Sequence, residues 1–407
     1  MSQMPIREYR GTGKVLSELG TTIDCKFVVR QTSSGKCILD CTTSDPASWN
    51  LMKEGQQKRL LSCRFEGTVI QTSARVIAGK VYLNERSVKQ DQSGLTRFAF
   101  EFLPLESVQI QYQQVSANSQ VEYRMGLANL LFIGTQRIGG SAGRHRGRID
   151  LRLAGQDIAL DSLEWYGSLG NRLADSRGIE VTSHLVTADL MSNRDRVKQK
   201  CDDLCVLLSF ATCNWVAPLY EDIFLNGQKV SSTLLPGKTF PYNPGELVID
   251  AREGKELKEY LEATYPNYVR LKNVLSMNIV TEYFVHSRLS GLLEAKYLMA
   301  AVGMERLRSR LSDYFKAKGK VLCRGSLRSD LREFYHDISM PYRPSELCFV
   351  DVRNKLVHTG GFPPDVDCVE EHQKLLNLCD RTILTTLGYR GKPYLNSAKG
   401  YDKELVP

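Results

Sequence analysis

Apolar and polar residues change their spacing near residue 255, and this change divides the sequence into two regions. Before residue 255, apolar residues tend to alternate with polar ones. Segment 96–102, for example, reads TRFAFEF, and a period of two is typical of a half-buried strand. After residue 255, apolar residues recur every three to four positions, which is the period of helices with one buried face. The pattern predicts an α+β fold, with a β-rich N-terminal region followed by an all-α C-terminal bundle.

The first 115 residues are predicted to form a β-rich subdomain. Segments 24–30 and 37–41 flank the turn-like TSSG and predict a hairpin, and segments 60–72 and 74–83 follow as further strands. Short strands with frequent turns favour a sandwich or a barrel-like sheet. Residues 1–115 contain no paired carboxylates, histidine cluster or phosphate-binding glycine motif.

Residues 116–255 are predicted to be a second β-rich segment with one embedded helix, at 193–213. The helix is indicated by Val197, Cys201, Leu204 and Leu208, which recur at helical spacing. The pair Asn226-Gly227 predicts a tight hairpin farther along. A turn-rich stretch then leads to the domain boundary near residue 255.

The C-terminal region, residues 256–392, is predicted to be an antiparallel bundle of four or five helices, followed by a polar tail at 393–407. Its apolar periodicity predicts helices at 257–265, 274–290, 291–318, 326–339 and 366–387.

Composition narrows the class of protein. A length of 407 residues predicts two or three domains, and 42% hydrophobic with 25% charged residues is typical of a soluble protein. The first residues lack the apolar core of a signal peptide, and no apolar run is long enough to cross a membrane. The eleven cysteines form no C-x-x-C pair, so we expect reduced thiols in the cytoplasm and neither a metal nor a cofactor. A net charge of +8 is compatible with a polyanionic partner.

The stretch 351–361, DVRNKLVHTGG, contains three side chains suited to cleaving RNA without a metal. His358 can transfer a proton near neutral pH. Arg353 stays charged and offers forked donors to phosphate oxygens. Asn354 can orient a hydroxyl or the imidazole without titrating. The pair Gly360-Gly361 is expected to end the helix.

The sequence Arg353-Asn354, three residues, His358 and then Thr-Gly-Gly resembles the RNase motif of HEPN domains. The helices before it, and the later TLGYRG at 386–391, are similar to the Apea-like HEPN family of bacterial defence proteins over roughly 256–392. The resemblance implies a metal-independent endoribonuclease that uses the 2′-hydroxyl of RNA and leaves a 2′,3′-cyclic phosphate. His358 would be the general acid and base, Arg353 would bind the scissile phosphate, and Asn354 would position the hydroxyl or the imidazole.

The resemblance also implies a homodimer. Residues five apart on a helix lie about 140° from one another, so Arg353 and His358 share a face only if the helix ends between them. Otherwise two copies of the motif meet across a two-fold axis. Glu294 and Glu305 are possible partners of Arg353, but surface carboxylates are commoner and neither is included in the site.

The second informative stretch, 306–332, holds nine basic residues against Asp313 and Asp330. Arg324, Arg328, Arg332 and His336 are spaced four residues apart, so in a helix they form one stripe. Lys355 lies in the motif at 351–361. One interpretation is a phosphate track for RNA, and the other is a solvated face paired with neighbouring acids; both stay open. The candidate RNA-binding residues are Lys355, Arg324, Arg328, Arg332 and His336.

Three functions remain in competition. The first is an antiphage, abortive-infection ribonuclease whose N-terminal region senses a phage-derived trigger or a partner protein. The second is a catalytically silent HEPN module that binds RNA, a nucleotide or a protein. The third is a toxin neutralised by a partner antitoxin.

Overall fold

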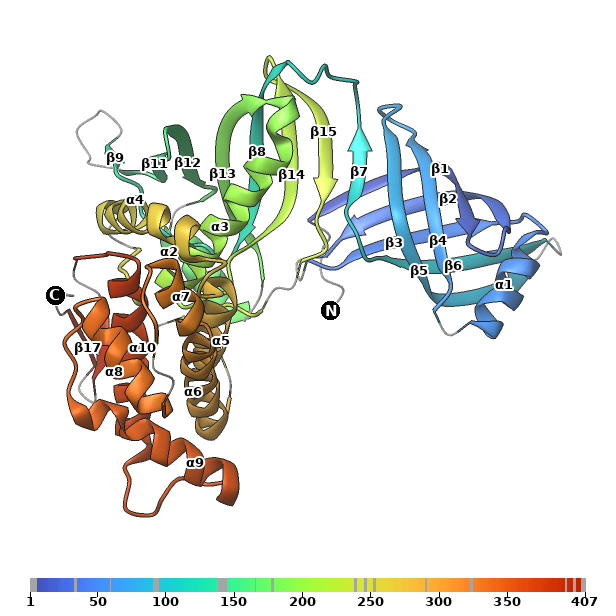
Figure 1. Ribbon diagram of the computed structural model, residues 1–407. Coiled ribbons are helices and arrows are strands. Elements are labelled where there is room, and N and C mark those ends of the chain that lie inside the picture. Colours follow the sequence, from blue (N-terminus) through green and yellow to red (C-terminus); the bar gives the residue numbers. More distant parts are fainter. Residues whose placement is uncertain are drawn as a thin grey trace. The chain divides into compact units, whose positions relative to one another are not determined.

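The structure is a computed structural model, and it divides into two compact units (Figure 1). The β unit comprises 1–129, 175–199 and 217–241, and the helical unit comprises 130–174, 200–216 and 242–407. The chain therefore enters and leaves each unit more than once. The described residues are 6–32, 35–58, 60–90, 95–137, 145–164, 166–176, 179–237, 240–244, 247–251, 254–289, 291–322, 325–391, 394–397 and 400–403.

The first six strands form a closed antiparallel sheet. Their order is β4-β1-β2-β3-β6-β5, and the ring closes because β5 pairs with both β4 and β6. The helix α1, Ser48–Gln57, packs on this sheet: Trp49 lies edge-on to Phe98, with ring centroids 5.0 Å apart. The strands are β1 Arg7–Ser17, β2 Thr22–Gln31, β3 Cys37–Thr43, β4 Ser62–Val69, β5 Arg75–Gln90 and β6 Thr96–Pro104.

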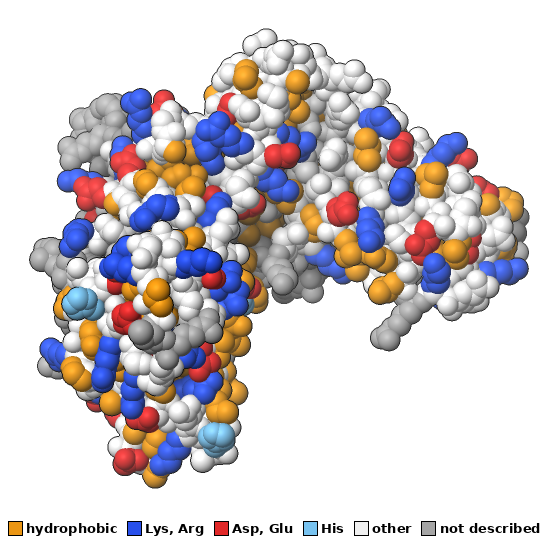
Figure 2. Space-filling view, viewed as in Figure 1, with side chains coloured by type: hydrophobic (Ala, Val, Ile, Leu, Met, Phe, Trp, Pro, Cys, Tyr) orange, Lys and Arg blue, Asp and Glu red, His pale blue; other side chains and the backbone are white. Residues whose placement is uncertain are grey.

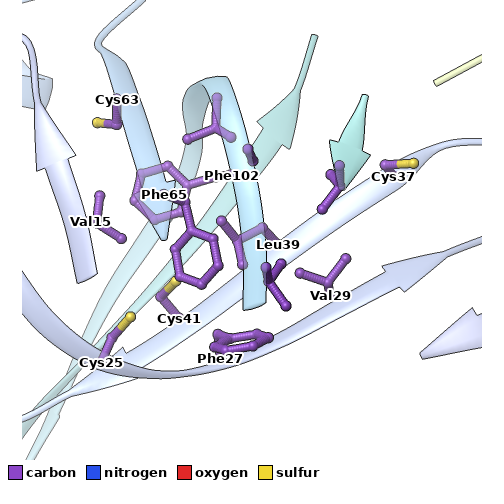
Figure 3. Packing of buried hydrophobic residues seen from close by; sticks show 14 of the residues in the cluster. Val15, Cys25, Phe27, Val29, Cys37, Leu39, Cys41, Cys63, Phe65 and Phe102 are labelled. Carbon is purple, nitrogen blue, oxygen red and sulfur yellow. The ribbon is translucent and has the colours of Figure 1, made fainter. Parts of the chain in front are cut away.

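Inward-facing apolar side chains fill the closed sheet (Figure 3). Phe27 and Phe65 meet edge-on at its centre, with ring centroids 4.9 Å apart. Cys25, Cys41 and Cys63 lie around them as buried thiols, and burial raises the pKa of Cys63 to about 12. These cysteines therefore act as small apolar side chains rather than as nucleophiles.

The other strands of the β unit extend this sheet from β5, in the order β5-β7-β15-β14-β8-β13. The β14–β15 connection is a two-residue turn, with Asn226 at φ 50° and Gly227 at φ 77°, as the Asn-Gly pair predicted. Arg7 on β1 donates two hydrogen bonds to the buried Asp222 carboxylate on β14, at 2.6 and 2.7 Å. These strands are β7 Val108–Gln111, β8 Gln120–Ala128, β13 Val181–Leu190, β14 Ala217–Leu225 and β15 Gln228–Leu234.

The helical unit contains the C-terminal helices together with the hairpin of β11, Arg148–Leu153, and β12, Gln156–Ser162. Its core includes a buried ion pair, in which Arg288 on α5 contacts both carboxylate oxygens of Asp380 on α10, at 2.6 and 2.7 Å. The helices are α4 Gly254–Leu271, α5 Met277–Leu289, α6 Leu293–Ser309, α7 Leu311–Ala317, α8 Leu327–Asp337, α9 Phe349–Thr359 and α10 Cys368–Thr386.

The remaining elements are short or lie where the chain passes between the units. The 3₁₀ helices are η1 Met191–Asn193 and η2 Pro344–Cys348, and the helices are α2 Tyr166–Ser176 and α3 Arg194–Thr212. The short strands are β9 Gln136–Arg137, β10 His145–Arg146, β16 Tyr394–Ser397 and β17 Gly400–Lys403.

The predicted α+β class is confirmed, with a large antiparallel sheet in the N-terminal half and helices in the C-terminal half. The predicted helix at 193–213 corresponds to α3. The segment 116–255, predicted to be one β-rich segment, is divided between the two units. Inside the predicted polar tail, β16 and β17 form a hairpin.

Two of the predicted helices differ clearly from the structure. Helix α4 continues through Pro266 to Leu271 because Tyr265, Tyr268 and Leu271 are buried on both sides of the proline. The predicted helix at 291–318 is two helices, α6 and α7, which meet at Arg310. Among the described residues, no helix combines the length and the apolar character needed to cross a membrane.

Candidate functional site

Helix α9 carries the predicted catalytic residues Asn354 and His358 on its exposed side, and Arg353 is half-buried at the edge of its packed side. Its other side is anchored by Phe349, Val352 and Leu356, which are buried at helical spacing. Gly360 ends the helix in a left-handed conformation at φ 75°, as the glycine pair predicted. Figure 1 shows α9 at one end of the helical unit. The helix is thus fixed by its apolar side while its polar side faces outward.

Arg353 contacts one carboxylate oxygen and one side-chain amide oxygen. Its Nη2 lies 2.7 Å from Oε1 of Glu305 on α6, and its Nη1 donates a hydrogen bond of 2.9 Å to Oδ1 of Asn354. The Arg353 side chain is 28% exposed, and its Nε is buried without a hydrogen-bond partner among the described residues. The sequence left both Glu294 and Glu305 as possible partners of Arg353, because helical spacing alone does not show which acid faces α9. In the structure the partner is Glu305.

His358 lies on the same side of α9 as Asn354, four residues earlier. The imidazole is exposed, and no described residue is its hydrogen-bond or ion-pair partner. The helix runs unbroken past His358 to Thr359, so it does not end between Arg353 and His358. Within one chain the two side chains therefore lie about 140° apart on a continuous helix.

Of the predicted RNA-binding residues, Arg328 lies against the motif helix. Its Nε donates to the carbonyl of Leu347 at 3.1 Å, and its Nη2 contacts the carboxylate of Asp351 on α9. Arg332 and His336 follow on the same face of α8 and are exposed, as is Lys355 on α9. Arg324 lies outside the described residues.

Several basic residues of the stretch 306–332 contact acids. Lys318 and Lys320 both contact Asp337, at 2.6 and 2.5 Å. Burial would raise the pKa of the Asp337 carboxyl, but hydrogen bonds from the two lysines outweigh it and lower that pKa to about 2. Asp337 lies beyond the end of the stretch 306–332 and supplies a negative charge from outside it.

Two arginines of the stretch are paired as well. Arg308 contacts Asp330 at 2.8 Å, and Arg310 contacts Asp313 at 3.2 Å. Figure 2 likewise shows lysine and arginine side chains interspersed with acidic ones on the helical unit. The contacts therefore favour the paired face for these residues, whereas Lys316, Arg332, His336 and Lys355 are exposed and have no carboxylate partner among the described residues.

His372 on α10 is a buried titratable group that the sequence did not single out. Burial, together with the positive charges of Arg288 and Lys296, lowers the pKa of its imidazole to about 4. Its Nε2 is buried without a hydrogen-bond partner among the described residues. His372 is therefore a neutral core residue near neutral pH, and His358 is the exposed histidine of the motif.

Acid should destabilise the helical unit through His372. In the unfolded chain the imidazole takes up a proton near its ordinary pKa of about 6.5, whereas in the folded chain it is protonated only near pH 4. The stabilisation is therefore complete above about pH 6.5 and is lost as the pH falls toward 4, with a total of about 3 kcal/mol. Urea unfolding at pH 7 and pH 5 should show that the free energy of unfolding falls less for His372→Leu than for wild type. An equal fall in the two proteins would contradict this role of His372.

No protein-family model, curated protein or solved structure matches this chain. The site is therefore interpreted from its own residues and from the motif.

Proposed function

We propose that this protein is a metal-independent endoribonuclease whose site is built on α9. The observation that carries the proposal is the arrangement of the motif: α9 is anchored by a buried apolar side, Asn354 and His358 are exposed on its surface, and Arg353 is fixed next to Asn354 by Glu305. An arginine, a carboxamide and an imidazole together supply phosphate binding, orientation and proton transfer.

The reaction follows from these groups. His358 in its neutral form removes the proton from a ribose 2′-hydroxyl, and the 2′-oxygen forms a bond to the adjacent phosphorus. The bond from phosphorus to the 5′-oxygen breaks, and a protonated imidazole returns a proton to that oxygen. The products are a 2′,3′-cyclic phosphate and a 5′-hydroxyl end. Arg353 stabilises the negative charge that develops on the phosphoryl oxygens.

The 140° between Arg353 and His358 supports a site shared by two chains. In a two-fold dimer, α9 of one protomer can present its arginine opposite the histidine of its partner. Val357, immediately before His358, is 53% exposed, and an exposed apolar side chain at the motif is suited to such an interface. We therefore propose a homodimer through the helical unit. A monomer by light scattering at assay concentration would overturn this part of the proposal.

Glu305 is proposed to position Arg353. Replacing it by glutamine should lower kcat by roughly tenfold, because a misplaced transition-state contact costs about 1 kcal/mol or more. KM should not rise, since removing a carboxylate beside Arg353 leaves more positive charge for the phosphate. Glu294→Gln is the matched control, because Glu294 lies on the same helix. Equal kinetics for the two variants would contradict the role.

The test of the function is cleavage by the purified protein in EDTA, with tRNA and a labelled single strand as substrates. Fragments ending in a 2′,3′-cyclic phosphate and beginning with a 5′-hydroxyl are the expected products. Tight RNA binding without cleavage would instead indicate a binding module. Cleavage that depends on added divalent metal would contradict the mechanism.

A further inference from the structure

A groove of about 1300 Å³ crosses the closed sheet of the β unit. Its lining includes a row of directly opposed, outward-facing residues that begins and ends on β5. Arg75 is opposite Thr68, Thr68 is opposite Thr12, Thr12 is opposite Lys26, and Lys26 is opposite Thr42. The row continues through Ala99 to Ser87. Opposed residues lie about 5 Å apart, so the groove presents cations and hydroxyls at regular intervals across the strands.

The groove is positively charged. It is lined by Lys14, Lys26, Arg75, Lys89 and Arg97 against two acids, Asp24 and Glu66. Both acids already have partners: Asp24 lies 3.6 Å from Lys14, and Glu66 lies 3.1 Å from Arg75. Lys26 and Lys89 are exposed, and neither has a carboxylate partner among the described residues. Two cations of the groove are therefore available to an external anion.

Small residues underlie the groove. Gly13 on β1 is opposite Gly67 on β4, and both belong to the groove lining. A Cβ on Gly13 would lie 2.5 Å from the carbonyl oxygen of Glu66, and one on Gly67 would lie 2.7 Å from the Phe27 ring. The backbones of the two strands thus need glycine at this point. The strands that carry the hydroxyl and cationic side chains are therefore closely packed at this point.

The lining points to phosphate groups rather than to bases. Lysine, arginine, threonine and serine are the side chains that contact phosphate and sugar oxygens, and they make up most of the row. The aromatic residue of the lining, Phe98, is only 2% exposed, so it offers no face on which a base could stack. The volume exceeds the usual range of about 300–1000 Å³ for small-ligand pockets, so the groove suits a chain of several phosphates.

We propose that the groove of the closed sheet is a second nucleic-acid site, which binds the phosphodiester backbone of a single strand without regard to sequence. The site lies in the β unit and is independent of the proposed cleavage chemistry on α9. RNA and DNA both carry the phosphodiester backbone that this groove would bind.

Fluorescence anisotropy with labelled single-stranded RNA and DNA of about 12 nucleotides tests this site. Every protein carries His358→Ala, so that binding is measured without cleavage and the result does not depend on the nuclease proposal. The full-length Lys26→Ala/Lys89→Ala variant is compared with Lys36→Ala/Lys53→Ala. The control removes two exposed lysines of the same unit from positions outside the groove.

The groove variant should bind both strands at least tenfold more weakly than the control. Its dependence of log Kd on log salt should become shallower by about 1.4, because each single-strand phosphate contact contributes about 0.7. Equal affinity of the two double variants would overturn the site. So would failure of the parent to bind either strand, or preference for a polyglutamate peptide, which would indicate an acidic protein segment as the occupant.

Discussion

The His358→Ala variant is expected to cleave RNA about 10²–10⁴-fold more slowly than wild type, the contribution that general acid–base catalysis typically makes. The imidazole is exposed and no described residue is its partner, so its removal should leave the fold of α9 unchanged. RNA affinity in a gel-shift assay should stay close to that of wild type, because Arg353 and Lys355 are still present. The measurement is single-turnover cleavage in EDTA, which reports chemistry directly.

His286→Ala is the matched control for losing an imidazole from the helical unit. The His286 ring lies beside Trp215, with centroids 5.7 Å apart, and this part of the unit does not include α9. Its cleavage rate should remain near the wild-type value. If His358→Ala retains more than about a tenth of wild-type activity, the assignment of the general acid and base to His358 fails.

A heterodimer of one Arg353→Ala chain and one His358→Ala chain is expected to regain about half of the wild-type activity, although each parent homodimer is nearly inactive. In a site shared across a two-fold axis, one of the two sites in this heterodimer combines intact Arg353 with intact His358. The other site combines both defects. The two chains are co-expressed with different affinity tags and purified through both tags in succession.

The outcome separates the two possible arrangements of the site. If Arg353 and His358 acted within one chain, every site of the heterodimer would lack one group, and activity would stay at the level of the parents. Doubly tagged Arg353→Ala homodimers serve as the control for any effect of the tags. Wild-type activity in doubly tagged wild-type dimers sets the scale.

Much of the fold could be predicted because local pattern and tertiary structure agree. The apolar spacing of α3, α5, α8 and α10 marks the sides that the structure buries. A closed sheet could not be chosen over a sandwich, because closure depends on β1 pairing with β4 and β3 pairing with β6, which are far apart in the sequence. Such long-range pairing leaves no periodic signal in the sequence.

The candidate site shows the same division. The motif on α9 and the stop at Gly360 could be recognised from the sequence, since both depend on neighbouring residues. The Arg353–Glu305 pair could not be selected, because it joins helices about fifty residues apart in the chain. Helix α9 itself was absent from the helices predicted by periodicity, since only Phe349, Val352 and Leu356 mark its buried side.

The interleaving of the two units has a consequence for synthesis on the ribosome. The β unit is complete in sequence once residue 241 has been added, whereas the helical unit still needs α4 through α10. Residues 130–174 and 200–216 of the helical unit are synthesised before the helices that they contact. Asp203, for example, can form its ion pair of 2.7 Å with Lys272 only after α4 has been synthesised. Helix α9 is among the last elements to emerge, so a growing chain carries no assembled candidate site until its translation is nearly finished.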